Sequence, residues 1–370
     1  VLLRVRRAIE RIGARRVVID SIANLFGRLS NTSAVRVLLH RLCRDLRKLG
    51  TTVVISAEQA GPGEPTRFGV EEYVADSVIE TWMEMGEQQI TRRIAVRKMR
   101  GAGYRSGAVQ FSIGAEGLRV YPKIAIDRSI AKVDLRRRRH FGIEGFDELL
   151  DGGLPHGHVT LISGNTGTGK TTFCMHFIRQ GLKAGEPCIY VALEEPSAQL
   201  RRAAAAHKWG LERSEREGLL HYLDVPLIDV IPDKVLYDIV DAVKETGARR
   251  LVIDSVSSLE SATLEADQVR QFLIQLAEFS KSLGLSCLLT YLVPGAFGAG
   301  EGQLLGQMQT TDMRLSSVVD SIILLRYVER GQKVKRLLNV LKLRGSRHDN
   351  AIYLYTLNQE GVRLGEKYEA

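Results

Sequence analysis

The amino-acid sequence predicts an α/β fold, in which helices flank a mostly parallel β-sheet. The first observation behind this prediction is the stretch 158–184, HVTLISGNTGTGKTTFCMHFIRQGLKA, which passes from an alternating apolar run through a Gly-rich turn into an amphipathic helical pattern. The second is the continued alternation of apolar runs with helical patterns up to residue 292. Such alternation is typical of parallel sheets that bind ligands at the carboxyl ends of their strands.

The expected elements follow one another in this order. We expect parallel strands at 158–163, 188–193, 219–223, 250–254 and 286–292. The expected helices between them lie at 170–184, 197–208, 233–246 and 266–283. Three further strands are not separated by helices, so we expect an antiparallel extension, as in a RecA-type core, at 319–327, 334–342 and 351–356.

The Gly-rich turn has every fixed position of a phosphate-binding loop, GxxxxGK[ST], between an expected strand and an expected helix. Its glycines are expected to take positive φ, so that successive backbone N–H groups converge on a polyphosphate. Lys170 supplies a positive charge, and Thr171 a hydroxyl for Mg²⁺. A turn without a ligand is the alternative, and the complete motif argues against it. The residues expected to bind ATP are Gly164, Asn165, Thr166, Gly167, Thr168, Gly169, Lys170, Thr171 and Thr172.

Three carboxylates end strands at the same expected edge. Asp254 follows the apolar run LVI, where a carboxylate suits the water shell of Mg²⁺. Glu194 and Glu195 follow CIYVAL, a strand that we place beside the phosphate loop, where they would orient water or accept a hydroxyl proton. The alternative for this pair is electrostatic support of the helix that begins after Pro196. We favour catalysis by Glu194 and Glu195 together with Lys170.

Composition is that of a globular enzyme. Apolar residues make up 44% and charged residues 26% of 370, which argues against disorder and leaves room for two domains. No apolar run is long enough for a membrane span, and the opening VLLRVRRAIERIG is too charged for a signal peptide, so we expect a cytoplasmic protein. Widely spaced cysteines argue against disulfides or a zinc site, namely Cys43, Cys174, Cys188 and Cys287.

Positive charge is concentrated in the first part of the chain. Residues 1–140 contain 27 Lys and Arg against 14 Asp and Glu, whereas the remainder contains 25 against 29. Either a nucleic-acid partner or the basic contact faces of a ring subunit would explain this excess. The run Arg136–Arg139 is either a DNA-binding patch or a solvated linker, and the lack of interleaved aromatic residues favours the linker.

An internal repeat divides the chain. ARRVVIDSIANL at 14–25 matches ARRLVIDSVSSL at 248–259, at a spacing of 234 residues. Later matches, such as Arg100 with Arg344, are spaced by 244, which leaves about ten extra residues in the Gly-rich loop 294–309. We therefore expect residues 128–370 to form a complete domain and residues 1–127 the C-terminal half of a similar one.

The first copy has no phosphate loop in this sequence. At the spacing of 234, the equivalent of Lys170 would precede Val1, so we expect that Asp20 serves no ATP site here and that the chain is N-terminally truncated. A sheet without its first strand is also expected to expose apolar side chains and to fold poorly by itself.

Several motifs together resemble the KaiC family of RecA-type ATPases: GIEGFDELLDGGLPHG, GNTGTGKT, ALEE, ARRLVIDS, VVDSIILLRYVE and KLRGSRHD, with RFGVEEY and VRKMRG in the first copy. The resemblance covers nearly the whole chain. It implies a tandem-domain protein that forms a hexameric double ring, with ATP between neighbouring subunits. It further implies that Lys342, Arg344 and His348 reach the ATP of the adjacent subunit. The first copy has Tyr104 in place of His348, which puts its contacts across the interface in doubt.

The resemblance also implies serine/threonine autokinase activity. Ser316 and Ser317 lie where the family's clock kinases have a Ser-Thr acceptor pair, and Thr311 matches a further hydroxyl. A polar loop before a strand is the alternative for these residues. Two other functions remain open, a DNA-dependent motor and a nucleotide-gated signalling scaffold with little turnover. A signalling or adaptor protein is a further partner that we consider. The Gly-rich loop 294–309 has no Lys or Arg and contains Glu301, so we do not expect it to bind nucleic acid.

Overall fold

The computed structural model describes residues 2–27, 31–59, 64, 66, 68–69, 71–85, 90–124, 136–227, 230–262, 266–293, 316–330 and 333–369. The chain divides into two compact units, Val1–Pro122 (unit 1) and Lys123–Ala370 (unit 2). The expected domain boundary at 127 and the Gly-rich loop 294–309 lie outside the described residues, as does Thr311.

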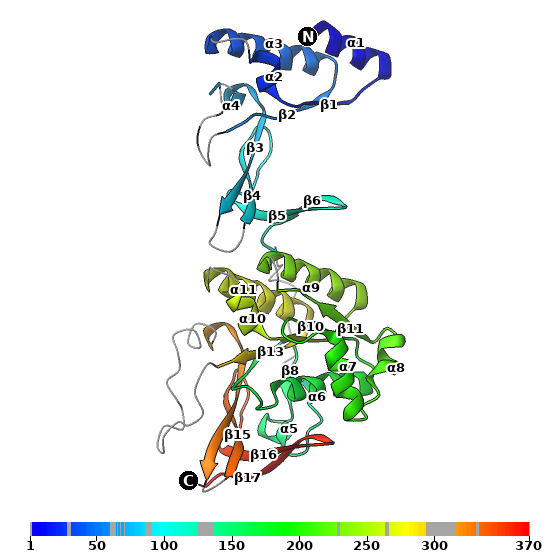
Figure 1. The fold of residues 1–370 in the computed structure, drawn as a ribbon, viewed down its shortest axis with the longest axis vertical. Helices are drawn as coiled ribbons and strands as arrows, with labels where there is room; N and C mark the ends of the chain where they lie inside the picture. Colours follow the sequence, from blue (N-terminus) through cyan, green and yellow to red (C-terminus); the bar gives the residue numbers. More distant parts are fainter. Residues whose placement is uncertain are drawn as a thin grey trace. The chain divides into compact units, whose positions relative to one another are not determined.

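Unit 2 is built on one large sheet (Figure 1). Its strands are β9 (Val159–Gly164), β10 (Cys188–Ala192), β11 (Leu220–Asp224), β12 (Arg250–Asp254), β13 (Ser286–Leu292), β14 (Ser321–Arg330), β15 (Lys333–Leu343), β16 (Ile352–Asn358) and β17 (Gly361–Lys367). Their order is β11-β10-β12-β13-β9-β14-β15-β16-β17. Neighbours from β11 to β14 are parallel, and those from β14 to β17 are antiparallel. The mostly parallel sheet and its antiparallel extension agree with the prediction, which missed β17 in this sheet and the short strands β7 (Arg138–Arg139) and β8 (Leu154–Pro155) outside it.

Helices cover both faces of this sheet. They are α5 (Phe146–Leu149), α6 (Lys170–Lys183), α7 (Ser197–Ala206), α8 (Leu211–Arg216), α9 (Pro232–Thr246), α10 (Val256–Ser261) and α11 (Ala266–Leu283). Every residue of β10 is buried, because both of its faces are covered, as is usual for a parallel strand. Tyr190 belongs to the core on the α6 face together with Phe173 and Phe177, whereas Ile189 and Val191 belong to the core beneath α9 and α11.

The Arg-rich segment 136–139, near the start of unit 2, is not a solvated linker throughout. Arg138–Arg139 forms a short strand, β7, which pairs with β8 (Leu154–Pro155). Arg139 is buried, and its guanidinium contacts the carboxylate of Glu186, whose other oxygen accepts a hydrogen bond of 2.7 Å from Arg250. Burial lowers the pKa of both guanidinium groups to about 10. The linker prediction is wrong for Arg139, because this residue is buried and pairs with a carboxylate that is distant in the sequence.

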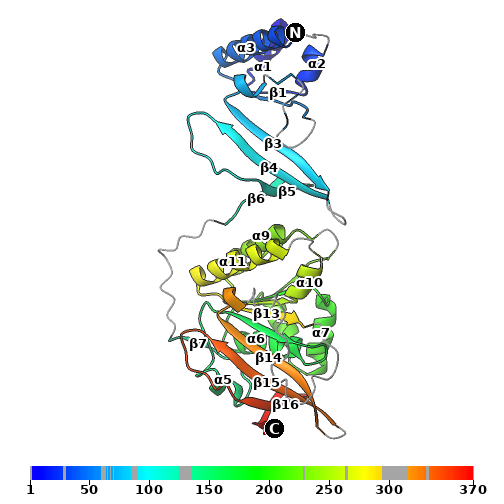
Figure 2. The same cartoon turned by 90° about the vertical axis from the view of Figure 1, so that its left-hand side faces the viewer.

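The described residues of unit 1 form two separate sheets. Its helices are α1 (Leu2–Ile12), α2 (Ile22–Phe26), α3 (Thr32–Lys48) and α4 (Glu71–Val74). The strands β1 (Arg16–Ile19) and β2 (Thr52–Ile55) are parallel. An antiparallel sheet follows, in the order β3 (Ser77–Met85), β4 (Ile90–Met99), β5 (Val109–Gly114) and β6 (Gly117–Tyr121), visible in Figure 2.

The first three helices bury only one face of the β1–β2 pair. Ile9, Leu39 and Leu42 form the core of unit 1 with the inner side chains of β1 and β2 packed against them. On the other face Val18 and Val54 are 72% and 60% exposed. Strands that carry apolar side chains on both faces are typical of a parallel sheet covered on both sides. The open face therefore leaves part of the apolar pattern of β1 and β2 unburied.

Candidate active site

The Gly-rich turn links the end of β9 to the start of α6. Gly167 and Gly169 take φ of 77° and 93°, as predicted, in a region that favours glycine. Gly164 does not take a positive φ, and for this residue the prediction is wrong. It is the last residue of β9, and a Cβ atom there would lie 2.5 Å from the backbone oxygen of Leu325. Glycine is needed at 164 for the close approach of β14.

Side chains from β15 and β16 donate hydrogen bonds to two carbonyl groups of the loop. The hydroxyl of Tyr355, on β16, donates to the oxygen of Thr168 at 2.6 Å, and Arg336 Nε donates to the oxygen of Gly167 at 3.4 Å. In a trans peptide the N–H points opposite to the C=O, so the N–H of Gly169 points away from the Tyr355 hydroxyl. In the described part of the chain, the N–H groups of Gly169, Lys170 and Thr171 have no protein acceptor. Such orphan donors at a helix start suit an anion.

Lys170 is folded over the loop. Its ammonium donates to the backbone oxygens of Gly164 and Asn165 at 2.9 and 3.0 Å. Burial lowers the pKa of Lys170, although the negative charges of Asp254 and Glu194 act in the opposite direction. The positive charge is therefore placed beside the orphan N–H groups, where phosphate oxygens would replace the carbonyl acceptors.

Asp254 lies at the end of β12, on the α6 side of the sheet, and is 6% exposed. Its Oδ2 accepts hydrogen bonds from Thr171 Oγ1 at 2.8 Å and from the hydroxyl of Tyr190 at 2.7 Å. Its Oδ1 accepts one from the hydroxyl of Thr290. The structure thus brings together the predicted Mg²⁺ residues, Thr171 and Asp254. Tyr190 and Thr290 were missed, because hydroxyl-bearing residues within buried strands look like ordinary core positions.

Glu194 and Glu195 follow β10, which is separated from β9 by β12 and β13. The expectation that this strand lies beside the phosphate loop is therefore wrong, because strand order in the sheet differs from chain order. The segment that carries both carboxylates still lies beside Asp254, since the N–H groups of Leu193 and Glu194 donate to the backbone oxygen of Asp254 at 2.8 and 3.2 Å. The Glu194 carboxylate also accepts a hydrogen bond of 2.9 Å from Ser255 Oγ.

Two observations bear on the chemistry of this pair. Burial, followed by the charges of Asp254 and Glu194, raises the pKa of Glu195. The start of α7 is capped by Asp224, which accepts from the N–H of Ser197 at 2.7 Å and from its hydroxyl at 2.5 Å. Asp224 therefore supplies negative charge and hydrogen-bond acceptors at this helix start in addition to any support from the two glutamates.

Lys342 and Arg344 lie toward the end of the strands that is opposite to the phosphate loop. Lys342 pairs with Ile322, level with Leu161, and the N–H of Arg344 bonds to the oxygen of Asp320, level with Val159. At about 3.3 Å per residue, the level of Arg344 is about 16 Å from the end of β9. These cations are therefore remote from the phosphate loop of their own unit. His348 is half-buried near them and makes no hydrogen bond with the described residues.

Asp320 and Ser316 hold these cations. Asp320 Oδ1 contacts Arg344 Nη1 at 3.2 Å and Lys281 Nζ at 2.9 Å, and Asp320 is 1% exposed. Lys342 Nζ donates to the oxygens of Ser316 and Val319 at 2.8 and 2.7 Å. Ser316 is half-buried and the next residue, Ser317, is exposed. The two serines therefore lie beside Lys342, away from the phosphate loop of the same unit.

Unit 1 contains contacts at the same repeat positions. Arg100 bonds through its N–H to the oxygen of Asp76 at 2.9 Å, and Lys98 Nζ donates to the oxygen of Glu72 at 2.7 Å. Asp76 also contacts Arg47 at 2.5 Å, and Arg47 lies at the repeat position of Lys281. The hydroxyl of Ser56 donates to Asp20 Oδ1, as Thr290 does to Asp254. Tyr104 instead donates to the oxygen of Arg97 at 3.0 Å.

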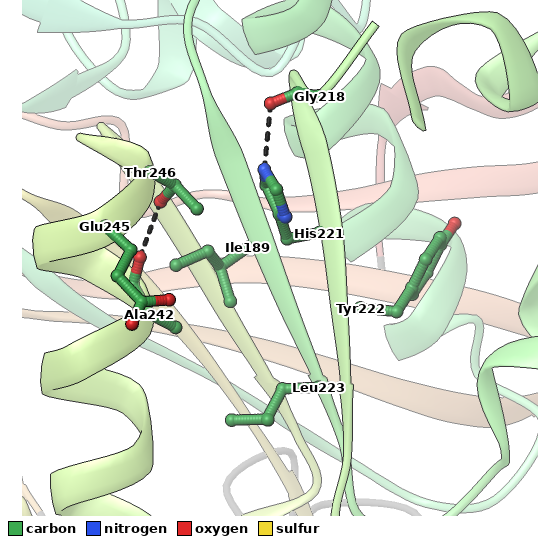
Figure 3. A pocket seen from close by; sticks show the side chains of 8 residues that line it. All are labelled: Ile189, Gly218, His221, Tyr222, Leu223, Ala242, Glu245 and Thr246. Atoms are coloured by element: carbon green, nitrogen blue, oxygen red, sulfur yellow. Dashed lines mark hydrogen bonds between the residues drawn. The ribbon is translucent and has the colours of Figure 1, made fainter. Parts of the chain in front are cut away.

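An open hollow of about 470 Å³ lies on the other face of the sheet (Figure 3). Ile189 and Leu223 face Ala242 of α9 there, while Tyr222 points to the opposite side of β11. Since the phosphate loop continues into α6, which packs on the other face, this hollow is not part of the candidate site.

The described residues contain neither a cluster of metal-ligating side chains nor a membrane-spanning helix. No group of three or more His, Cys, Asp and Glu side chains is placed to hold a metal ion, and no helix has the length and apolarity needed to cross a bilayer. The pair Thr171 and Asp254 nevertheless fits Mg²⁺ bound with a nucleotide. Such an ion takes most of its ligands from water and phosphate, and it requires few from the protein.

A sequence-family profile described as "ATPase: KaiC" matches residues 1–125 and 140–369. Circadian clock protein KaiC3 of Synechocystis sp. (strain PCC 6803) is 34% identical over 372 aligned residues, covering 99% of this chain and 71% of that protein. Circadian clock oscillator proteins KaiC of Parathermosynechococcus lividus and Prochlorococcus marinus (strain MIT 9313) are 32% and 31% identical, covering 99% of this chain and 66% and 71% of those proteins. The chain therefore spans about two thirds of the length of these relatives.

Proposed function

The chain belongs to the KaiC family of ATPases, and on that premise we propose that unit 2 binds Mg²⁺ and ATP at its phosphate loop and hydrolyses the nucleotide. The observation that carries this proposal is the conjunction of orphan N–H groups at 169–171 with the Lys170 ammonium and the Thr171–Asp254 pair. Anion donors, a positive charge and a cation-binding hydroxyl meet at one helix start.

Each residue has a distinct role in the proposed reaction. The loop N–H groups and Lys170 bind the phosphate oxygens and hold the terminal phosphoryl group in line with its attacker. Thr171 binds the cation, and Asp254 holds its water shell; when bound, Mg²⁺ supplies positive charge to the phosphates. One of Glu194 and Glu195 accepts the proton of the attacking water. ADP and inorganic phosphate are the products.

We place ATP between subunits of a ring, as the family resemblance implies. Lys342 and Arg344 lie too far from the loop of their own unit to touch its nucleotide, which supports a role, together with His348, at the site of a neighbour. Binding at such an interface favours assembly, so ATP should promote a hexamer. The matching contacts of Asp76 and Asp320 support a tandem repeat, in which unit 1 is a domain related to unit 2.

We also propose autophosphorylation of Ser316 or Ser317. Their place beside Lys342 supports transfer in trans, because a neighbour's site that receives Lys342 would also receive these serines. In this step the serine oxygen bonds to the terminal phosphorus, the bond to ADP breaks, and Glu194 or Glu195 takes the hydroxyl proton. The added negative charge at an interface would bias the ring between two states, which suits a regulatory protein that signals through an adaptor.

Turnover of Mg²⁺-ATP by the 370-residue chain, measured with and without single-stranded DNA, tests the ATPase proposal. We expect hydrolysis that does not depend on DNA. Stimulation by DNA would instead favour a motor, and turnover at the background rate would favour a scaffold.

Intact-mass analysis after incubation with Mg²⁺-ATP tests the kinase proposal. We expect an added phosphate that is lost in a Ser316→Ala, Ser317→Ala double variant and in Lys170→Ala. Phosphate that persists in the double variant would exclude these acceptors.

A further inference from the structure

The Asp254 carboxylate receives hydroxyl hydrogen bonds from three separate elements. Thr171 at the start of α6 and Tyr190 in β10 both donate to Oδ2, at 2.8 and 2.7 Å. Thr290 in β13 donates to Oδ1. Neither Tyr190 nor Thr290 belongs to the phosphate-loop motif or to the carboxylate pair after β10. Their convergence on Asp254 therefore requires its own explanation.

Donors on both oxygens fix the plane of the carboxylate. A carboxylate has about four lone-pair positions, and three of them are used here. Two of the donors, Tyr190 and Thr290, come from the strands on either side of β12, because β10 and β13 are both its neighbours in the sheet. Rotation of the side chain would break the bonds to both flanking strands. Asp254 is therefore held with Oδ2 toward Thr171 before any ligand binds.

The burial of Tyr190 indicates that its hydroxyl group, and not only its ring, has a role in the site. Tyr190 is 2% exposed and lies in the apolar core beneath α6, where phenylalanine would bury a similar ring without a polar group. A phenol in such a place needs a hydrogen-bond partner, and its partner is the oxygen to which Thr171 also donates. An ordinary core tyrosine could be satisfied by a backbone carbonyl. Tyr190 is instead connected to the cation-binding hydroxyl through one shared atom.

Unit 1 supplies an independent precedent for half of this arrangement. Ser56, at the repeat position of Thr290, donates to Oδ1 of Asp20, at the repeat position of Asp254. The hydroxyl on Oδ1 is therefore common to both units of the chain. The hydrogen bond from Tyr190 to Oδ2 comes from β10, a strand with no counterpart among the described residues of unit 1.

We propose that Tyr190, together with Thr290, is a positioning residue for the divalent cation: it holds Asp254 so that the carboxylate orients the Thr171 hydroxyl and the water shell of Mg²⁺. This inference rests on the function proposed above. Without the phenol hydroxyl the carboxylate can turn, and Thr171 loses a fixed acceptor. The backbone N–H groups and Lys170 are unaffected, so the loss should fall on the cation and not on the phosphates.

The test compares Tyr190→Phe with Tyr222→Phe in the 370-residue chain. Tyr222 is a matched control, because its ring lies 6.0 Å from that of Tyr190, on the adjacent β11, and its hydroxyl does not contact Asp254. ADP binding is measured by calorimetry in EDTA and over a series of Mg²⁺ concentrations. For Tyr190→Phe we expect about a tenfold higher half-saturating Mg²⁺ concentration, as is usual when a group that orients a metal ligand is lost. ADP affinity in EDTA should stay within about twofold of wild type, because the phosphate-binding donors are retained.

Thermal unfolding of each variant shows whether it folds. If Tyr190→Phe does not fold, Thr290→Val tests the same inference, because Thr290 donates to Oδ1 of Asp254. An unchanged Mg²⁺ requirement in folded Tyr190→Phe overturns the inference, and so does an equal shift in Tyr222→Phe or an equal loss in EDTA. The wild-type chain separates this failure from that of the proposed function. If wild-type ADP binding is itself independent of Mg²⁺, the proposed function fails; if it depends on Mg²⁺ and Tyr190→Phe behaves identically, only the role of Tyr190 fails.

Discussion

The Lys170 ammonium, at the start of α6, donates a hydrogen bond of 2.9 Å to the backbone oxygen of Gly164, at the end of β9. A second bond, of 3.0 Å, reaches the oxygen of Asn165. The charge is thus already inside the loop and held by neutral acceptors. Binding of a polyphosphate would exchange those acceptors for anionic oxygens, which form stronger hydrogen bonds with an ammonium group.

Replacing Lys170 by Ala or Met is therefore expected to weaken ATP binding by about 10–100-fold, the value of a hydrogen bond to a charged group. Lys170→Met keeps most of the apolar stem and is the better control for packing. Its free energy of unfolding should be close to wild type, because the buried ammonium gains only carbonyl contacts in the free protein. Calorimetry with Mg²⁺-ATP measures the affinity, and wild-type affinity in both variants would refute the assignment of the loop.

If Glu194 is the base, Glu194→Gln should retain ATP affinity and lose turnover. Ser255 holds this carboxylate at 2.9 Å, and glutamine can keep that bond but cannot accept a proton. The loss of a general base costs about 100-fold or more in turnover. Single-turnover kinetics and calorimetry separate the two effects, with Glu195→Gln as the matched variant. An equal loss of affinity and turnover would give Glu194 a structural role.

The raised pKa of Glu195 gives a related pH dependence. If Glu195 is the base, it works in its ionised form, so turnover should fall as the pH drops through a value above the ordinary range for glutamate. Glu194→Gln removes one of the negative charges that raise the pKa of Glu195, and it should move this fall to lower pH. A pH profile of turnover that is unchanged in Glu194→Gln would count against Glu195 as the base.

Arg344 and Lys281 form a matched pair, because both contact Oδ1 of the buried Asp320. Arg344→Ala and Lys281→Ala should each lower the free energy of unfolding by about 1 kcal/mol, since each removes one charged contact. Only Arg344→Ala should also abolish hydrolysis, because only Arg344 is proposed to reach the neighbour's ATP. Equal hydrolysis by the two variants would exclude that role.

Mixing variants tests whether the site is shared between subunits. Lys170→Ala and Arg344→Ala are each expected to be inactive alone. In an equal mixture, about a quarter of the interfaces pair an intact loop with an intact Arg344, so about a quarter of the wild-type rate should return. If the mixture stays inactive although light scattering shows mixed rings, Arg344 acts within its own subunit or not at all.

The parts of the fold that the sequence predicted are those with local signals. The apolar runs of β9, β10, β12 and β13 and the motif around Lys170 depend on residues close in sequence. The position of β10 relative to β9 could not be predicted, because sheet order is decided by packing between distant segments. The same holds for Arg139, whose partner Glu186 is remote in sequence.

The missed site residues have a similar cause. Tyr190 and Thr290 are single hydroxyl-bearing residues within buried strands, and their pattern is that of core positions. Only the pairing of β10, β12 and β13 brings both to Asp254. Thr171 and Asp254 were found because each belongs to a motif with a known spacing to a strand or helix.

His176 should make unit 2 less stable in mild acid. It lies in α6, is 5% exposed, and its Nε2 accepts a hydrogen bond of 3.0 Å from the N–H of Val362 in β17. Its ring also packs edge-on against Trp209. An imidazole that accepts through Nε2 is neutral, and protonation would place two N–H donors face to face. Burial, together with the nearby charge of Arg179, lowers the pKa of His176 from 6.5 to about 4.

The sign of the effect follows from which state binds the proton. Above pH 6.5 His176 is neutral in both states and contributes no pH dependence. Between pH 6.5 and about 4 the unfolded chain binds a proton that the folded chain excludes, so the free energy of unfolding falls as the pH falls. At pH 5 this costs about 2 kcal/mol. His176→Gln keeps an acceptor for the N–H of Val362 but removes the ring that packs against Trp209, so its free energy of unfolding at pH 7 should be lower than that of wild type. Because the titrating group is gone, its free energy of unfolding should fall less than that of wild type between pH 7 and pH 5. Urea unfolding at pH 7 and pH 5 measures both values; a difference between the two pH values as large as that of wild type would show that His176 does not cause the acid sensitivity.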